Sequence, residues 1–153
     1  MSEIVFLRAA VPDDARECLR IRGLTRENAF SEEDLASLGI TAESWAAGIE
    51  DGSCPGYVAL VDEQMAGYCF GDSQSGEIMV LALLPDYESL GLGRRLLTQM
   101  MQDLQGRGFT RLFLACNSDP QVRSYGFYRH LGWSESGQRD EFGDDILEYH
   151  FAD

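Results

Sequence analysis

Two glycines and two arginines stand together in the stretch "YESLGLGRRLL", residues 87–97, at a predicted strand-to-helix junction. The first turn of a helix carries unpaired N–H groups and a partial positive charge, so it attracts anions. Gly91 and Gly93 would let a bulky phosphate approach the main chain, because neither residue has a Cβ. Arg94 and Arg95 add full positive charges beside it. The spacing therefore indicates a site for a diphosphate.

Two common phosphate-binding motifs do not fit this stretch. A P-loop requires a lysine after its second glycine, and the chain contains no lysine. A dinucleotide-binding fingerprint requires a third glycine, but Leu96 stands at that position. The absence of lysine also excludes Schiff-base chemistry on a side-chain amine.

The composition narrows the classes of partner. The chain has 26 acidic and 12 basic residues, which gives a net charge of −14. A strongly acidic protein repels nucleic-acid phosphates and attracts cations such as amines. No apolar run approaches the ~20 residues of a membrane span, and the first residues lack the pattern of a secretory signal. We therefore expect a cytoplasmic protein that binds neither nucleic acid nor membrane.

The four cysteines lie far apart in the sequence, and no two of them form a C-x-x-C pair. This spacing predicts free thiols in a reducing compartment, with no metal site and no catalytic cysteine. They are Cys18, Cys54, Cys69 and Cys116.

The elements that must position the glycine stretch follow from apolar periodicity. A first strand over 3–10 precedes a helix opened by Pro12, whose apolar face includes Leu24. A polar segment with a short helix and a helix capped by Thr41 come next. Three strands follow, the first two joined by a tight acidic turn at Asp62 and Glu63 and the last of them "EIMVLALLP". A long helix with apolar residues at i+4 steps comes next. A strand, a helix over 118–132 and two further strands around the acidic turn "EFGDD" complete the chain. The order predicts one α/β domain over residues 1–153 with a mixed sheet.

Four segments, "EIMVLALLP", "DYESLGLGRRLL", "TRLFLACN" and "YGFYRHLGW", follow one another within residues 56–135. Together they resemble the GNAT superfamily of acetyl-CoA-dependent N-acetyltransferases. Its pattern is [Gln/Arg]-x-x-Gly-x-[Gly/Ala] after a strand that ends near proline, with [Phe/Leu]-Tyr-x-x-x-Gly-[Phe/Trp] on a later helix. The two motifs in this order are more specific than either alone.

The resemblance implies a GNAT-like fold, with helices flanking a mostly antiparallel sheet in which two parallel strands splay apart. Acetyl-CoA would lie in the splay, its pantetheine beside one strand edge and its diphosphate on main-chain amides. The implied cofactor-binding residues are Leu83, Leu84, Ser89, Leu90, Gly91, Leu92, Gly93, Arg94, Asn117 and Tyr128.

The resemblance also implies roles in catalysis. Tyr128 would protonate the CoA sulfur, although packing in the core explains the same residue. Glu77 would act as the base for the amine, although a solvated charge at a strand end explains it equally well. Glu27 and Asn28 lie in the segment that would cover the acceptor, and ordinary surface polarity accounts for them too. Main-chain N–H groups near Leu83 and Leu84 would polarise the thioester carbonyl.

Two positions depart from the family pattern. Glu88 stands where the pattern has Gln or Arg, so an anion lies near the expected phosphates unless its side chain points outward. Many members have an asparagine seven residues before the tyrosine, where this chain has Gln121. Asn117, which lies further back in the chain, would then take that part.

These inferences predict an N-acetyltransferase that moves an acetyl group from acetyl-CoA to a primary amine, directly within a ternary complex. The amine would belong to a small molecule or to a peptide or protein. The alternative is a non-catalytic acyl-CoA-binding module or sensor of the same fold. The exposed strand edges are compatible with a homodimer.

Overall fold

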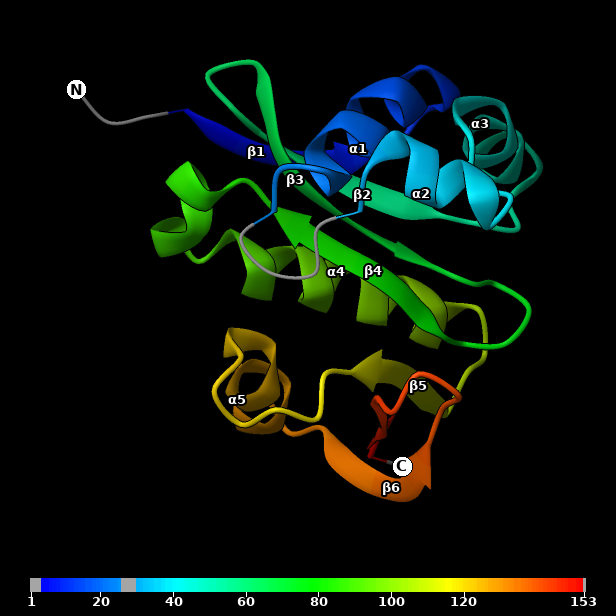
Figure 1. Cartoon of the computed structure of the whole chain (residues 1–153), viewed down its shortest axis with the longest axis vertical. Coiled ribbons are helices and arrows are strands. Elements are labelled where there is room, and N and C mark those ends of the chain that lie inside the picture. The colour runs from blue at the N-terminus through cyan, green and yellow to red at the C-terminus, as the bar shows by residue number, and fades with distance from the viewer. Residues whose placement is uncertain (1–3, 26–29, 153) are drawn as a thin grey trace.

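The computed structural model describes residues 4–25 and 30–152, except for the side chain of Ser89. Strands and helices follow one another in the predicted order (Figure 1). The strands are β1 (Val5–Ala9), β2 (Gly56–Val61), β3 (Gln64–Gly71), β4 (Ile78–Leu83), β5 (Arg111–Cys116), β6 (Ser134–Arg139) and β7 (Asp145–His150). The α-helices are α1 (Ala15–Arg22), α2 (Glu32–Ser37), α3 (Ala42–Asp51), α4 (Leu92–Gly106) and α5 (Arg123–His130), with short 3-10 helices η1 (Pro12–Asp14) and η2 (Pro85–Leu90).

The strands form two antiparallel groups. One has the order β1-β2-β3-β4, and the other has the order β5-β7-β6. Tight turns explain the neighbouring pairs: Asp62 and Glu63 join β2 to β3 with positive φ angles of 50° and 71°, as a two-residue hairpin requires. This confirms the acidic turn predicted from sequence.

A single parallel bridge, between Glu77 and Phe113, joins the two groups at the start of β4 and β5. Beyond it no pairing between β4 and β5 is found in the described part of the chain, so these parallel strands diverge toward their carboxyl ends. The predicted mixed sheet with two splayed parallel strands is therefore confirmed.

Helices cover both faces of the four-stranded group. Helix α4 runs along one face, with α1 and α3 on the other, as Figure 1 shows. The i+4 series predicted for α4 is confirmed, because Leu92, Leu96, Met100 and Leu104 are all fully buried. These side chains fix the start of α4 against β4, and this position of α4 sets the geometry of the glycine stretch.

Two helices are shorter than their sequence patterns suggested. Gly23 caps α1, so Leu24 lies beyond the helix and is half-exposed, although the pattern placed it on the buried face. Helix α5 begins only at Arg123. Before it, the side chains of Asn117 and Asp119 accept main-chain N–H groups two residues ahead, at 2.9 Å each, and thereby favour turns over helix.

Over residues 4–25 and 30–152, none of the helices combines the length and apolar character that crossing a membrane would need.

Candidate active site

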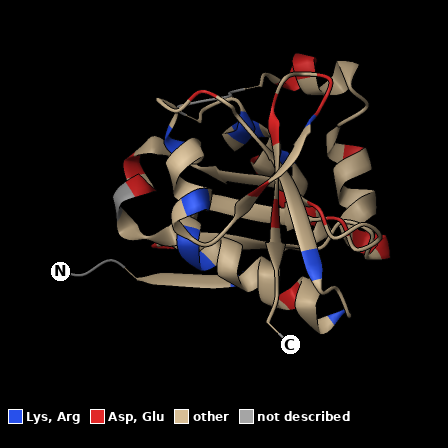
Figure 2. Cartoon of the chain, turned by 90° about the horizontal axis from the view of Figure 1, so that it is seen from below, with Lys and Arg blue, Asp and Glu red and all other residues tan. Residues whose placement is uncertain are grey.

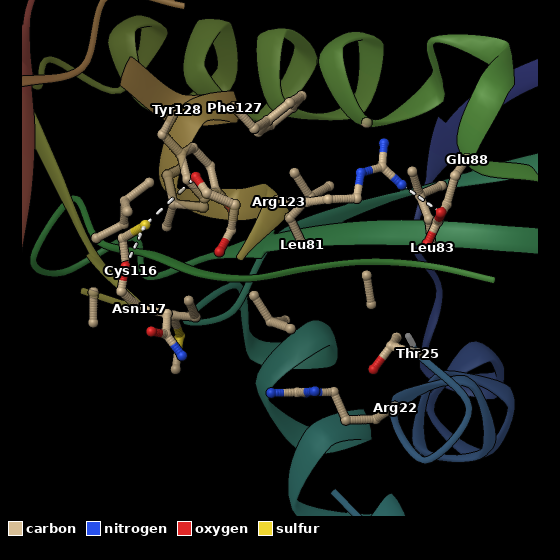
Figure 3. Close-up of a pocket in the computed structure, with 18 of the residues that line it drawn as sticks. Arg22, Thr25, Leu81, Leu83, Glu88, Cys116, Asn117, Arg123, Phe127 and Tyr128 are labelled. Carbon is tan, nitrogen blue, oxygen red and sulfur yellow. Dashed lines mark hydrogen bonds and ion pairs between the residues drawn. The ribbon is translucent and has the colours of Figure 1, made fainter. Parts of the chain in front are cut away.

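A cleft of about 460 Å³ opens where β4 and β5 diverge. Its walls come from β4 and the start of α4 on one side, and from β5, the loop after it and α5 on the other. Arg22, Thr25 and Phe30, at and after the end of α1, line its floor, as Figure 3 shows for the first two. The cleft lies within the size range of small-molecule and cofactor sites.

The exposed edge of β4 provides main-chain groups to the cleft. The N–H of Leu84 donates to the carbonyl of Ala66 at 2.8 Å, which makes these two residues a hydrogen-bonded antiparallel pair. Hydrogen-bonding direction alternates along such a strand, so the N–H and C=O of Leu81 and Leu83 face away from β3, toward β5. Leu83 therefore suits the predicted pairing with a ligand. Leu84 does not, because its N–H is already paired and the residue does not line the cleft.

The glycine stretch forms a cradle at the mouth of the cleft. Gly91 has a φ of +72°, and a Cβ placed there would have no atom within 4 Å, so the backbone here is open to a ligand. Gly93 packs closely instead, since a Cβ there would lie 3.3 Å from Leu83 and 3.5 Å from Phe127. The first helical hydrogen bond of α4 reaches back from the N–H of Arg95 to the carbonyl of Gly91. The N–H groups from Gly91 to Arg94 therefore precede the repeating helical bonds and suit an anion.

The other predicted cradle residues differ in position. Arg94, predicted to bind the cofactor, lines the cleft. Leu92 is fully buried in the core, so only its main chain can face an anion. The side chain of Leu90 is 41% exposed and does not line the cleft. The structure does not describe the side chain of Ser89, whose main chain is part of η2.

Glu88 does not point outward. Its carboxylate lines the cleft and forms an ion pair with the guanidinium of Arg123, which reaches across from the start of α5 (Figure 3). The side chain of Glu88 is 16% exposed, against 60% for Arg123. Arg123, 35 residues later in the sequence, therefore holds the carboxylate of Glu88 beside the glycine cradle.

Tyr128 lines the same cleft, opposite β4. Its ring packs edge-on against Phe127 and Trp133, with centroid distances of 5.1 and 6.2 Å. Burial, with the neighbouring thiols of Cys69 and Cys116, raises the pKa of the Tyr128 phenol above its usual value. The phenol therefore stays protonated at neutral pH, as a proton donor must. Tyr128 both packs in the core and lines the cleft, so the two interpretations of its sequence position are compatible.

Two carboxylates near the cleft have raised pKa values. Burial, with the nearby Asp72, raises the pKa of Glu77, which forms the bridge at the closed end of the splay and does not itself line the cleft. Burial, with Asp140 and Asp145, raises the pKa of Asp144, which lines the cleft. Sequence reasoning missed Asp144, because it assigned the acidic stretch around it only to a turn.

Two residues at the end of β5 also line the cleft. Asn117 does so, whereas Gln121, its competitor for the family position, is exposed and does not. The thiol of Cys116 contacts the carbonyl of Ser124 at 3.5 Å, and burial raises its pKa. A thiol with a raised pKa is a poor nucleophile, which agrees with the prediction of no catalytic cysteine.

The floor of the cleft carries positive charge. Arg22 lies over the ring of Phe30, with its guanidinium carbon 4.7 Å from the ring centroid. Burial lowers the pKa of Arg22, although arginine stays charged at neutral pH. Glu27 and Asn28, predicted to contact the acceptor, lie outside the described residues.

Acidic residues dominate the rest of the molecule. Figure 2 shows them spread over helices and loops, with fewer basic residues between them. Among the described residues, no group of His, Cys, Asp and Glu side chains has the arrangement of a metal site.

Comparisons with known proteins agree with this geometry. A family model described as "Acetyltransferase (GNAT) family" matches residues 15–133, well over half of the chain. A search of curated proteins finds no match.

Solved structures share the fold. PaiA N-acetyltransferase from Thermoplasma acidophilum, in complex with coenzyme A, is 19% identical, with a TM-score of 0.80 over 99% of this chain and 100% of that one. A GNAT-family protein from Desulfovibrio desulfuricans is 25% identical, with a TM-score of 0.75 over 97% and 100%. YncA from Salmonella typhimurium, solved with its cofactor acetyl-CoA, is 15% identical, with a TM-score of 0.73 over 98% and 95%.

Proposed function

The chain belongs to the GNAT acetyltransferase family, and from this premise we propose that it transfers an acetyl group from acetyl-CoA to a primary amine. One observation carries the proposal. A free strand edge, a glycine cradle at a helix start and a protonated tyrosine all line one cleft. The strand edge can pair with the amides of an extended thioester cofactor, the glycine cradle can bind its phosphates, and the tyrosine can reach its sulfur.

The residues of the cleft fit coenzyme A. Leu81 and Leu83 offer main-chain groups to the pantetheine amides, while the N–H groups from Gly91 to Arg94 receive the diphosphate. Asn117 faces the pantetheine from the β5 side. When bound, acetyl-CoA supplies an acetyl group activated as a thioester, and the remaining chemistry is proton transfer by this chain's own residues.

The proton balance assigns two roles. The acetyl carbon leaves sulfur and joins nitrogen, the amine loses one proton and the sulfur gains one. Tyr128 donates the proton to sulfur, since its raised pKa keeps the phenol protonated. Glu77 accepts the amine proton through a water molecule, because it precedes the lining residues Ile78 and Met79 and burial raises its pKa. Asp144 is the competing base.

The state of the cysteine supports direct transfer within a ternary complex. An acyl-enzyme route would need a thiolate in the cleft, and burial keeps the Cys116 thiol protonated. The acceptor amine would enter beside Arg22 and Thr25, on the opposite side of β4 from α4.

The central experiment replaces Tyr128 with phenylalanine. Tyr128→Phe should lower kcat by about 100-fold or more while leaving CoA affinity unchanged, because only the proton donor is lost. Turnover is measured as release of free CoA thiol over a panel of amines. Tyr125→Phe is the matched control: Tyr125 is on the same helix, under Arg129 and outside the cleft, so turnover should not change. Full activity in Tyr128→Phe would remove the proposed acid.

The base is identified by a second pair of variants. The rate of the wild type should rise with pH as the carboxyl group of Glu77 loses its proton, at a pH above 4.5, the usual glutamate pKa. Glu77→Gln should lower kcat and abolish this rise. Asp144→Asn should leave this dependence intact. The reverse result would assign the base to Asp144.

One observation favours the alternative of a non-catalytic CoA-binding module. The carboxylate of Glu88 lies beside the cradle, where it opposes phosphate binding. Calorimetric binding of CoA without thiol release across a broad amine panel would support the module over the enzyme.

A further inference from the structure

The ion pair between Glu88 and Arg123 spans the cleft from one wall to the other. Glu88 belongs to η2, which leads directly into the glycine cradle, and Arg123 is the first residue of α5. The pair, drawn in Figure 3, joins the two walls. The Glu77–Phe113 bridge joins β4 to β5 at the opposite end, where these strands begin. A pantetheine arm bound between β4 and α5 would therefore lie next to this ion pair.

The charges of the pair are placed unevenly for an incoming phosphate. Glu88 is only three residues before Gly91, and its mostly buried carboxylate would repel phosphate oxygens at the cradle. Arg123 is the more exposed partner, on a longer side chain that already lines the cleft. Its guanidinium can reorient toward another anion nearby, because a planar fork binds carboxylate and phosphate in the same way.

We propose that Arg123 is a cofactor-binding residue that exchanges partners: it pairs with Glu88 in the free protein and binds a phosphate of coenzyme A in the complex. Glu88 acts as the competing anion that sets the affinity. This inference rests on the proposed function only in that coenzyme A is the ligand. The competing explanation is a fixed brace, in which the pair holds η2 against α5 whether or not ligand is bound.

The exchange makes two variants change affinity in opposite directions. Glu88→Gln should tighten CoA binding about tenfold, because it removes the carboxylate that competes for Arg123 and repels phosphate. Arg123→Gln should weaken CoA binding about tenfold, because a charge-assisted hydrogen bond is lost. Arg123→Lys should retain part of the affinity, since the charge remains without the fork. A fixed brace predicts weaker or unchanged binding in both Glu88→Gln and Arg123→Gln.

Calorimetry at one ionic strength measures these affinities, with CoA, dephospho-CoA and pantetheine as ligands. Neither variant should alter pantetheine binding, which lacks phosphate. An Arg123 effect retained with dephospho-CoA assigns the contact to the diphosphate, and an effect lost with it assigns the contact to the 3′-phosphate. Equal effects on pantetheine, or a Glu88→Gln variant that binds CoA no more tightly than the wild type, would overturn the exchange.

A matched control separates local from overall charge. Glu135→Gln also removes a carboxylate paired with an arginine, at 2.9 Å, but on β6 and away from the cleft. It should leave CoA affinity unchanged. Wild-type protein that fails to bind CoA at all refutes the proposed function, whereas normal wild-type binding with unchanged variants refutes the exchange alone.

Discussion

The left-handed backbone at Gly91 gives a test of the cradle that separates stability from binding. Gly91 has a φ of +72°, and Gly39, after α2, has a φ of +82°. A Cβ added at either position would meet no atom within 4 Å, so steric collision contributes nothing in either case. Only the strain of a side chain in the left-handed region remains, about 1–2 kcal/mol. Gly91→Ala and Gly39→Ala should therefore lower the free energy of unfolding by similar amounts.

Only one of the two substitutions should affect the cofactor. Alanine at 91 shifts the backbone away from the left-handed region, and this turns the first N–H groups of α4 from the cleft. Loss of one hydrogen bond to a charged group is worth about 1.5–3 kcal/mol, or roughly 10- to 150-fold in the dissociation constant of CoA. Gly39→Ala should bind CoA like the wild type, because Gly39 does not line the cleft.

Urea denaturation without ligand measures the first effect, because bound CoA would stabilise the folded state by itself. Calorimetry at fixed ionic strength measures the second, since salt screens exposed charges. If Gly91→Ala loses stability like Gly39→Ala but binds CoA as tightly as the wild type, the cradle does not hold the phosphates.

Three further substitutions test the framework of the cleft. Gly67→Ala would place a Cβ 2.5 Å from the carbonyl oxygen of Ala82, so β3 and β4 must shift. We expect the free energy of unfolding in urea to fall by about 1–3 kcal/mol and CoA binding to weaken. An unchanged denaturation midpoint would contradict this close packing. Tyr68→Phe removes a buried hydrogen bond of 2.9 Å to a carbonyl of α1 and should cost about 1 kcal/mol, measured the same way; no loss would mean that this bond contributes nothing. Burial opposes ionisation of Asp14, but hydrogen bonds from Arg8 and a main-chain N–H outweigh it and lower the pKa of this carboxyl. Ionised Asp14 therefore stabilises the folded state above pH 3.8, and this stabilisation is lost as the pH falls through the lower pKa of the folded state. Asp14→Asn should lower the free energy of unfolding at neutral pH and make it depend less on pH in acid, measured by urea denaturation at a series of pH values. Parallel pH curves for the variant and the wild type would refute this.

The sequence by itself determined the features that depend on near neighbours. The apolar series of α4, the cap at Thr41 and the hairpin at Asp62 are each encoded within a few residues, and all are confirmed. The glycine stretch is also local, because its position between a buried strand and a helix follows from residues 77–97 alone. The family motifs are equally short, which is why they could be found without a structure.

The tertiary structure decided what depends on register and on distant partners. A shift of one residue would exchange the free N–H of Leu83 with the paired N–H of Leu84, and only the pairing with β3 fixes which one faces the cleft. The pairing of Glu88 with Arg123, and the entry of Asp144 into the cleft wall, join segments far apart in the chain. Such contacts depend on how separate elements pack together, and no short stretch of sequence encodes them, because the energy that holds them comes from the shared core.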